Sequence, residues 1–195
     1  VKRDGKRELF DANKINLALV KASEGLPEQI AKVVQVASEV QLTLFDGITS
    51  EQLDEAVINA TLQNVKDDPD YDKIAARLLL KTIYKKVLGD YETFDELKKL
   101  HAVKFPEYIK QATELGLLDS RMTNSKLFDI KRLAAALDPA KDDLSKYLGV
   151  ITNKNRYSLR KGSGEPIEVP QFTHMRIAMG LSYNAKNPTE SALDF

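Results

Sequence analysis

Residues 1–15 read VKRDGKRELFDANKI, and this segment decides how the fold is interpreted. Asp4-Gly5 is a strong turn signal between two short extended runs, so we expect a β-hairpin with its tip at these two residues. Lys2 and Arg3 then lie together on one arm. The hairpin therefore presents two cationic side chains at one edge.

The predicted hairpin leads directly into a helix. Asp11 is a typical N-cap residue, which places Lys14 in the first helical turn. Unpaired backbone N–H groups and the positive end of the helix dipole favour an anion at that turn. The pattern predicts a phosphate-binding site, although a solvated basic hairpin that caps a helix would have the same spacing.

Four helices are expected within residues 1–90. They cover 13–23, 27–44, a segment that starts at Thr49 with capping-box spacing to Gln52, and a segment opened by Asp68-Pro69 that ends at Gly89. Apolar residues recur at helical spacing along the second helix, at Ile30, Val33, Val34, Ala37 and Val40. We expect residues 1–90 and residues 91–195 to form separate domains.

The second half is less regular. Helical patterns cover 94–103, 106–115 and 131–137, with breaks expected at Pro106, Gly116 and Pro139. Residues 150–152 and 157–159 are interpreted as strands joined by a polar turn. Pro170 starts a final helix.

Composition excludes several classes of protein. With 43% hydrophobic and 30% charged residues, the 195-residue chain has the composition of a globular protein. Its 29 basic and 29 acidic residues cancel, which argues against nucleic acid or membrane surfaces as partners. No apolar run approaches the roughly 18 residues of a membrane span, so a cytoplasmic location is expected. The chain has no cysteine, which excludes thiolate metal sites and cysteine nucleophiles within it.

Two sets of motifs carry a family resemblance. Residues 1–90 resemble the ATP-cone, a nucleotide-sensing module, through the segments 1–5, 10–15, 46–50 and 69–80. Residues 91–195 are similar to the start of the catalytic domain of class I and class II ribonucleotide reductase large subunits, through the segments 147–149, 155–157, 165–166, 170–172 and 175–181. The resemblance implies a mainly α fold: a short β-hairpin capping a four-helix bundle, followed by the helical N-terminal region of an α/β ten-stranded barrel enzyme.

The resemblance also implies a set of nucleotide-binding residues. Those expected to hold the triphosphate are Lys2, Arg3, Lys14 and Lys85; those expected to sandwich the adenine are Val1 and Ile15; those expected to make polar contacts are Glu8, Asn13 and either Thr49 or Ser50. Asp54 departs from a histidine found in some relatives, which leaves the discrimination of ATP from dATP open. We expect no catalytic residue and no metal ligand in this chain, and we interpret His101 and His174 as surface or packing residues.

The function implied is regulatory. ATP or dATP, together with Mg²⁺, would act as allosteric effector of a ribonucleoside di- or triphosphate reductase, whose thiyl-radical chemistry needs cysteines that this chain lacks. The expected partners are the cysteine-bearing barrel of the large subunit, a radical-generating small subunit and further copies of the large subunit. The chain would be a truncated piece or one part of a split enzyme, inactive alone and without the radical cofactor.

Two alternatives come from other classes. The module could act as a stand-alone nucleotide-sensing or structural protein. A cone-bearing repressor of reductase genes is disfavoured because such regulators carry a zinc ribbon of paired cysteines.

Overall fold

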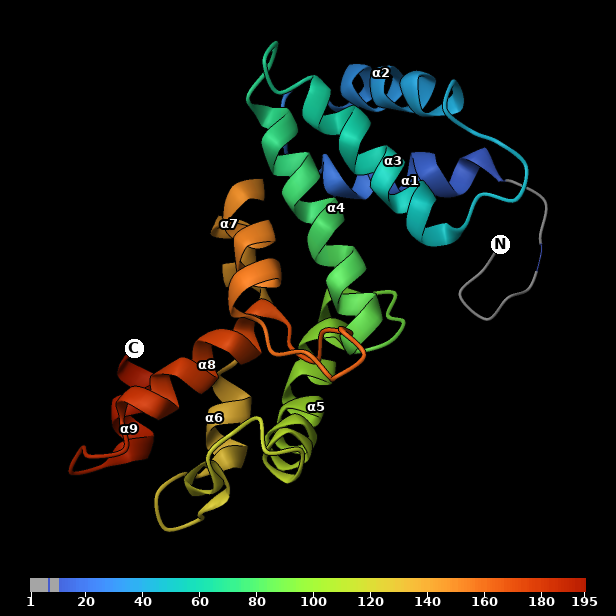
Figure 1. Ribbon diagram of the computed structural model, residues 1–195. Helices are drawn as coiled ribbons and strands as arrows, with labels where there is room; N and C mark the ends of the chain where they lie inside the picture. The colour runs from blue at the N-terminus through green and yellow to red at the C-terminus, as the bar shows by residue number, and fades with distance from the viewer. Residues whose placement is uncertain (1–6, 8–10) are drawn as a thin grey trace. The chain divides into compact units, whose positions relative to one another are not determined.

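The computed structural model describes residue 7 and residues 11–195 (Figure 1). The predicted hairpin, with Val1, Lys2, Arg3 and Glu8, lies outside these residues. The described part is mainly helical, as predicted. Its contacts divide it into a first unit, up to Thr82 together with Ser145–Gly149, and a second unit, Ile83–Leu144 together with Val150–Phe195.

The first unit contains three complete helices and most of a fourth: α1 (Ala12–Ala22), α2 (Gln29–Gln41), α3 (Ser50–Gln63) and α4 (Asp70–Val87). The predicted caps are confirmed. The Asp11 side chain accepts a hydrogen bond from the Asn13 N–H at 3.0 Å, and Thr49 forms both halves of a capping box with Gln52. Figure 1 shows α1, α2 and α3 lying next to one another, and α2 packs on both α1 and α3.

The predicted buried face of α2 is partly wrong. Ile30 is 81% exposed and Val34 is 59% exposed, whereas Val36 is fully buried. Lys32 is also buried, because its Nζ lies 2.7 Å from Asp68 Oδ2 and donates to the Pro27 carbonyl at 2.8 Å. A lysine whose ammonium group is paired can occupy the inner face of a helix. Which face of α2 is buried therefore depends on this ion pair as well as on the spacing of apolar residues.

Two further interactions fasten the first unit together. The Arg77 guanidinium, on α4, donates to the carbonyl of Ala22, the last residue of α1, at 3.0 Å and to that of Glu24 at 2.8 Å. The Tyr147 N–H donates to Asp72 Oδ2 at 3.1 Å. This second bond ties Ser145–Gly149 to α4, and Tyr147 and Asp72 are 75 residues apart in the sequence.

The second unit is built around a longer helix than predicted. Its elements after α4 are α5 (Phe94–Glu114), η1 (Ser120–Thr123), α6 (Ile130–Ala136), η2 (Pro139–Leu144), η3 (Asn153–Tyr157), α8 (Pro170–Leu181) and α9 (Pro188–Asp194), while α7 (Tyr147–Thr152) begins in the first unit and ends in the second. The expected break at Pro106 is wrong, because α5 continues through it. A proline inside a helix costs about 3 kcal/mol. Burial of Phe105, Tyr108 and Ile109 on one face of α5 opposes that cost.

The predicted strands at 150–152 and 157–159 are also wrong. Residues 147–152 form α7, and the next five residues form a π-helical turn, η3. The Ser158 N–H closes this turn on the Asn153 carbonyl at 2.9 Å. The Leu159 N–H donates to the Glu168 side chain at 2.8 Å, so a side chain takes the place of a strand partner. Among the described residues, β-pairing is limited to one bridge, between Arg160 and Pro166.

None of the helices in the described part of the chain is both long enough and apolar enough to cross a membrane.

Candidate functional site

The N-terminal turn of α1 carries three of the predicted nucleotide-binding residues. Asn13 and Lys14 are exposed, whereas Ile15 points into the core of the first unit and is only 6% exposed. The Asp11 cap fixes this turn, because its carboxylate holds the Asn13 N–H and its carbonyl accepts from the Lys14 N–H at 3.1 Å. Two polar side chains are thus held at the positive end of a helix dipole.

The start of α3 carries the two hydroxyl candidates. Thr49 is exposed and its Oγ1 accepts from the Gln52 N–H at 3.1 Å, while Ser50 is half-buried. The Thr49 hydroxyl therefore serves as the helix cap, as capping preferences predict. An N-cap hydroxyl keeps its own proton to donate, so this role is compatible with a ligand contact.

Lys85 lies in a different environment. It belongs to the second unit, and its Nζ is 3.3 Å from Asp90 Oδ1. Asn13, Lys14, Ile15, Thr49 and Ser50 all belong to the first unit.

Sequence reasoning missed the part that Lys32 plays. In the acidic run at residues 67–72, Asp68 and Asp70 lie 2.7 and 3.5 Å from the Lys32 ammonium group. The hydrogen bond to Asp68 raises the pKa of Lys32. A lysine at an inward helical position was the signal in the sequence that could have indicated this pair.

The second unit contains a fully buried carboxylate. Glu168 accepts hydrogen bonds from the Tyr108 hydroxyl, from the Arg176 guanidinium at 2.6 and 3.2 Å, from the Thr173 hydroxyl at 3.0 Å and from the Leu159 N–H. These partners come from α5, α8 and the segment before α8. The network therefore has a structural role, fixing the 157–168 segment between two helices.

A second buried carboxylate, Asp142, lies within η2. Its two oxygens accept from the Tyr84 hydroxyl at 2.6 Å and from Gln171 Nε2 at 2.7 Å. Burial raises the pKa of Asp142, against the opposing effect of these two hydrogen bonds. His101 packs edge-on against the Tyr84 and Phe172 rings, and burial lowers its pKa. His101 is thus a packing residue, whereas His174 is exposed, as the sequence predicted for the pair.

The raised pKa of Asp142 leads to a prediction about pH. The folded chain holds a proton at Asp142 more tightly than the unfolded chain does, so this group favours folding more as pH falls from neutral through the folded pKa. Asp142→Asn removes the titration and keeps an acceptor for Gln171. Urea unfolding from pH 7 to pH 4 is the measurement. As the pH falls, the free energy of unfolding of the wild type should rise relative to that of the variant. A pH-independent difference between them would contradict the assignment.

Metal-binding side chains are not clustered in the described part of the chain: no group of three His, Cys, Asp or Glu residues there could hold an ion.

Comparison with known proteins gives consistent results. Residues 1–86 match the ATP cone domain family. The chain is 31% identical to the alpha subunit of ribonucleoside-diphosphate reductase from Helicobacter pylori, with 100% of this chain and 23% of that protein covered. It is 29% identical to the alpha subunit from Chlamydia trachomatis, with 99% and 18% covered, and 30% identical to the large subunit from Arabidopsis thaliana, with 93% and 21% covered. The chain spans about a quarter or less of the length of these relatives.

Proposed function

Since residues 1–86 are an ATP-cone domain and the whole chain is homologous to the N-terminal region of ribonucleoside-diphosphate reductase alpha subunits, we propose that it is the nucleotide-sensing regulatory part of such a reductase. In this proposal the cone binds ATP or dATP and thereby controls the reduction of ribonucleotides elsewhere in the large subunit. The observation that carries it is the exposed first turn of α1, with Asn13 and Lys14, inside the matched domain.

The chemistry of this turn suits a triphosphate. The helix dipole and the Lys14 ammonium group both favour an anion at this turn. Thr49 and Ser50 are candidate hydroxyl donors in the same unit. We propose that Lys2, Arg3 and Lys14 hold the phosphates. Val1 and Ile15 would lie against the adenine, and Glu8 and Asn13 would make polar contacts to the nucleotide. Lys85 belongs to the second unit and stays a prediction of the family resemblance. Mg²⁺ would enter with the nucleotide, coordinated by phosphate oxygens and water.

Regulation requires two states that the effectors bind differently. ATP and dATP differ by one hydroxyl, and a difference in binding between two states typically supplies about 1–3 kcal/mol of coupling. We propose that the two states are different associations of the complete large subunit, with the cysteine-bearing remainder of that subunit and a radical-generating small subunit as partners. The radical cofactor then belongs to those partners.

The alternative, a stand-alone sensing or structural module, is weaker. The similarity to the reductase alpha subunits extends over the complete chain, well beyond the 86 residues of the cone. A module that acted alone would not need residues 87–195.

The proposal predicts that the chain binds ATP and that Lys14→Ala weakens the binding. Loss of a charge-assisted phosphate contact costs about 1.5–3 kcal/mol, which is a loss of affinity of roughly 10- to 150-fold. Isothermal titration calorimetry with ATP and dATP is the measurement. Lys21→Ala, in the last turn of the same helix, is the matched control and should bind like the wild type. Equal affinity for ATP in the Lys14 and Lys21 variants would remove Lys14 from the site.

A further inference from the structure

The segment 154–161 of the second unit carries a run of positive charge. Its cations are Lys154, Arg156, Arg160 and Lys161, and it contains no acidic residue. None of these four side chains forms an ion pair with a carboxylate among the residues that the structure describes. Charges that the chain does not neutralise attract an acidic partner. The run is therefore a candidate surface for recognition by another protein.

The basic run ends in an exposed turn. Residues 161–165 are all exposed. Gly164 has a φ of +84°, which glycine adopts without strain, and its N–H donates to the Lys161 carbonyl at 2.8 Å. Ser163 lies between Gly162 and Gly164, and its hydroxyl makes no hydrogen bond to the rest of the described chain. The tip of the turn therefore exposes a serine hydroxyl between two residues that have no side chain.

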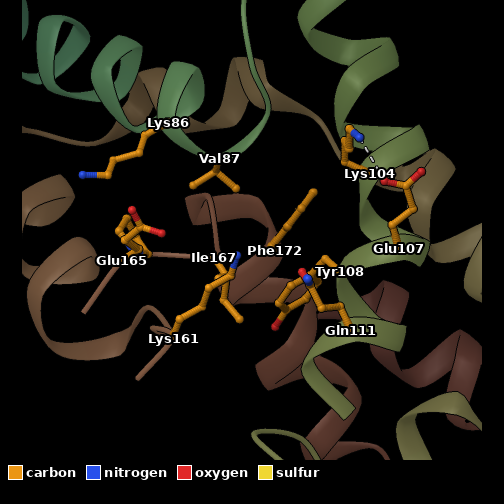
Figure 2. A pocket seen from close by; sticks show the side chains of 11 residues that line it. Lys86, Val87, Lys104, Glu107, Tyr108, Gln111, Lys161, Glu165, Ile167 and Phe172 are labelled. Atoms are coloured by element: carbon orange, nitrogen blue, oxygen red, sulfur yellow. Dashed lines mark hydrogen bonds and ion pairs between the residues drawn. The ribbon is translucent and has the colours of Figure 1, made fainter. Parts of the chain in front are cut away.

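The turn is also open on the side of a neighbouring hollow. Lys161 and Glu165 line this half-open hollow of the second unit, and Figure 2 shows both at its edge, with Lys86 above Glu165 in this view. The backbone bonds at the base of the turn run from the Lys161 N–H to the Glu165 carbonyl at 2.9 Å and from the Ile167 N–H to the Leu159 carbonyl at 3.0 Å. An exposed turn with few such bonds opens locally at low free energy, so an enzyme can bind it in extended form.

The cations before Ser163 have the spacing that arginine-directed protein kinases recognise. Arg160 lies three residues and Lys161 two residues before Ser163, and Ser163 is the one serine or threonine of the chain with an arginine three residues before it. Kinases of this class place carboxylates against these two positions. The Arg160 guanidinium donates to the neutral carbonyls of Lys154 and Gly164, at 2.7 and 3.0 Å. Hydrogen bonds to a carboxylate are stronger, so a kinase can displace these two bonds.

We propose that Ser163 is a phosphorylation site for an arginine-directed serine/threonine protein kinase, with ATP as the phosphoryl donor. The Ser163 Oγ attacks the γ-phosphorus of ATP, the bond from that phosphorus to the β,γ-bridging oxygen breaks, and ADP leaves. The hydroxyl proton passes to the catalytic aspartate of the kinase. A phosphoserine carries a charge of about −1.5 to −2, so the modification cancels up to about half of the positive charge of the 154–161 run. This site lies in the second unit and does not depend on nucleotide binding in the first.

Phosphorylation of the complete chain in vitro tests the proposal. The chain is incubated with Mg-ATP and the catalytic subunit of cAMP-dependent protein kinase, which is arginine-directed, and the modified residue is identified by mass spectrometry. We expect one phosphate, on Ser163, and none in Ser163→Ala. Ser125→Ala is the matched control, because Ser125 is also exposed but has Met122 three residues before it. This variant should accept phosphate like the wild type.

Charge variants test the recognition. Arg160→Met and Lys161→Met each remove one cation that the kinase should contact, and each should lower kcat/KM for phosphorylation at least about tenfold. Lys161→Met leaves the two backbone contacts of Arg160 in place. Arg156→Met removes the same charge from the run, seven residues before Ser163, and should change kcat/KM less than about twofold. An unmodified wild-type chain, phosphate on another residue, or equal effects of Lys161→Met and Arg156→Met would overturn the proposal.

Discussion

Glu168→Ala should lower the free energy of unfolding of the second unit by about 3–5 kcal/mol, the cost of breaking a buried ion pair by removing one partner. The variant leaves the Arg176 guanidinium, which is only 17% exposed, without its carboxylate. It also leaves the Tyr108 hydroxyl and the Leu159 N–H without their acceptor. Each buried donor without a partner adds a desolvation penalty. Urea unfolding followed by circular dichroism is the measurement.

A second ion pair in the same unit provides the control. Glu190 on α9 pairs with Arg132 on α6, but these side chains are 45% and 53% exposed. Solvent screens such a pair, so Glu190→Ala should change stability little. Glu168→Gln keeps the volume and an acceptor oxygen. Its loss of unfolding free energy should therefore lie between the losses for Glu168→Ala and Glu190→Ala. If Glu168→Ala were no more costly than Glu190→Ala, the buried network would not be what holds the 157–168 segment.

The second large effect concerns activity. Under the proposed function, residues 1–195 alone should reduce no ribonucleotide with any reductant, because the family resemblance implies chemistry on cysteine thiols and this chain has none. The complete large subunit that carries this segment, supplied with its radical generator, should convert ribonucleotides to deoxyribonucleotides. Product formation measured by chromatography, with di- and triphosphate substrates, distinguishes these outcomes.

The response to effectors belongs to the same experiment. ATP and dATP should change the rate of the complete assembly in opposite directions, with a matching change in its sedimentation profile, because a distant site can act only by biasing a discrete global state. Reduction by residues 1–195 alone would contradict the proposal. So would a complete assembly that reduces no ribonucleotide.

The candidate site could be predicted from sequence only in part. The cap at Asp11 and the capping box at Thr49 follow from local hydrogen bonding, so the sequence placed Lys14 and Ser50 correctly in first helical turns. Whether Ile15 points inward, and which unit holds Lys85, depends on packing between helices that are distant in sequence. No short motif encodes those contacts.

The sequence by itself determined the mainly helical character, the helix starts at Asp11, Thr49 and Pro170, and the match of residues 1–86 to the ATP cone domain. These features depend on the side chains and backbone groups of a few neighbouring residues, so the sequence shows them directly.

Tertiary structure alone decided the features that local rules predicted wrongly. Helix α5 continues through Pro106 because its buried face packs across the second unit, and Lys32 turns inward because Asp68, in the segment between α3 and α4, neutralises it. The expected strand at 157–159 did not form: a π-helical turn ends at Tyr157, and the Leu159 N–H donates to the Glu168 side chain while its carbonyl accepts from the Ile167 N–H. In each case a partner remote in the sequence supplied free energy larger than the local preference, and only the folded chain brings that partner within reach.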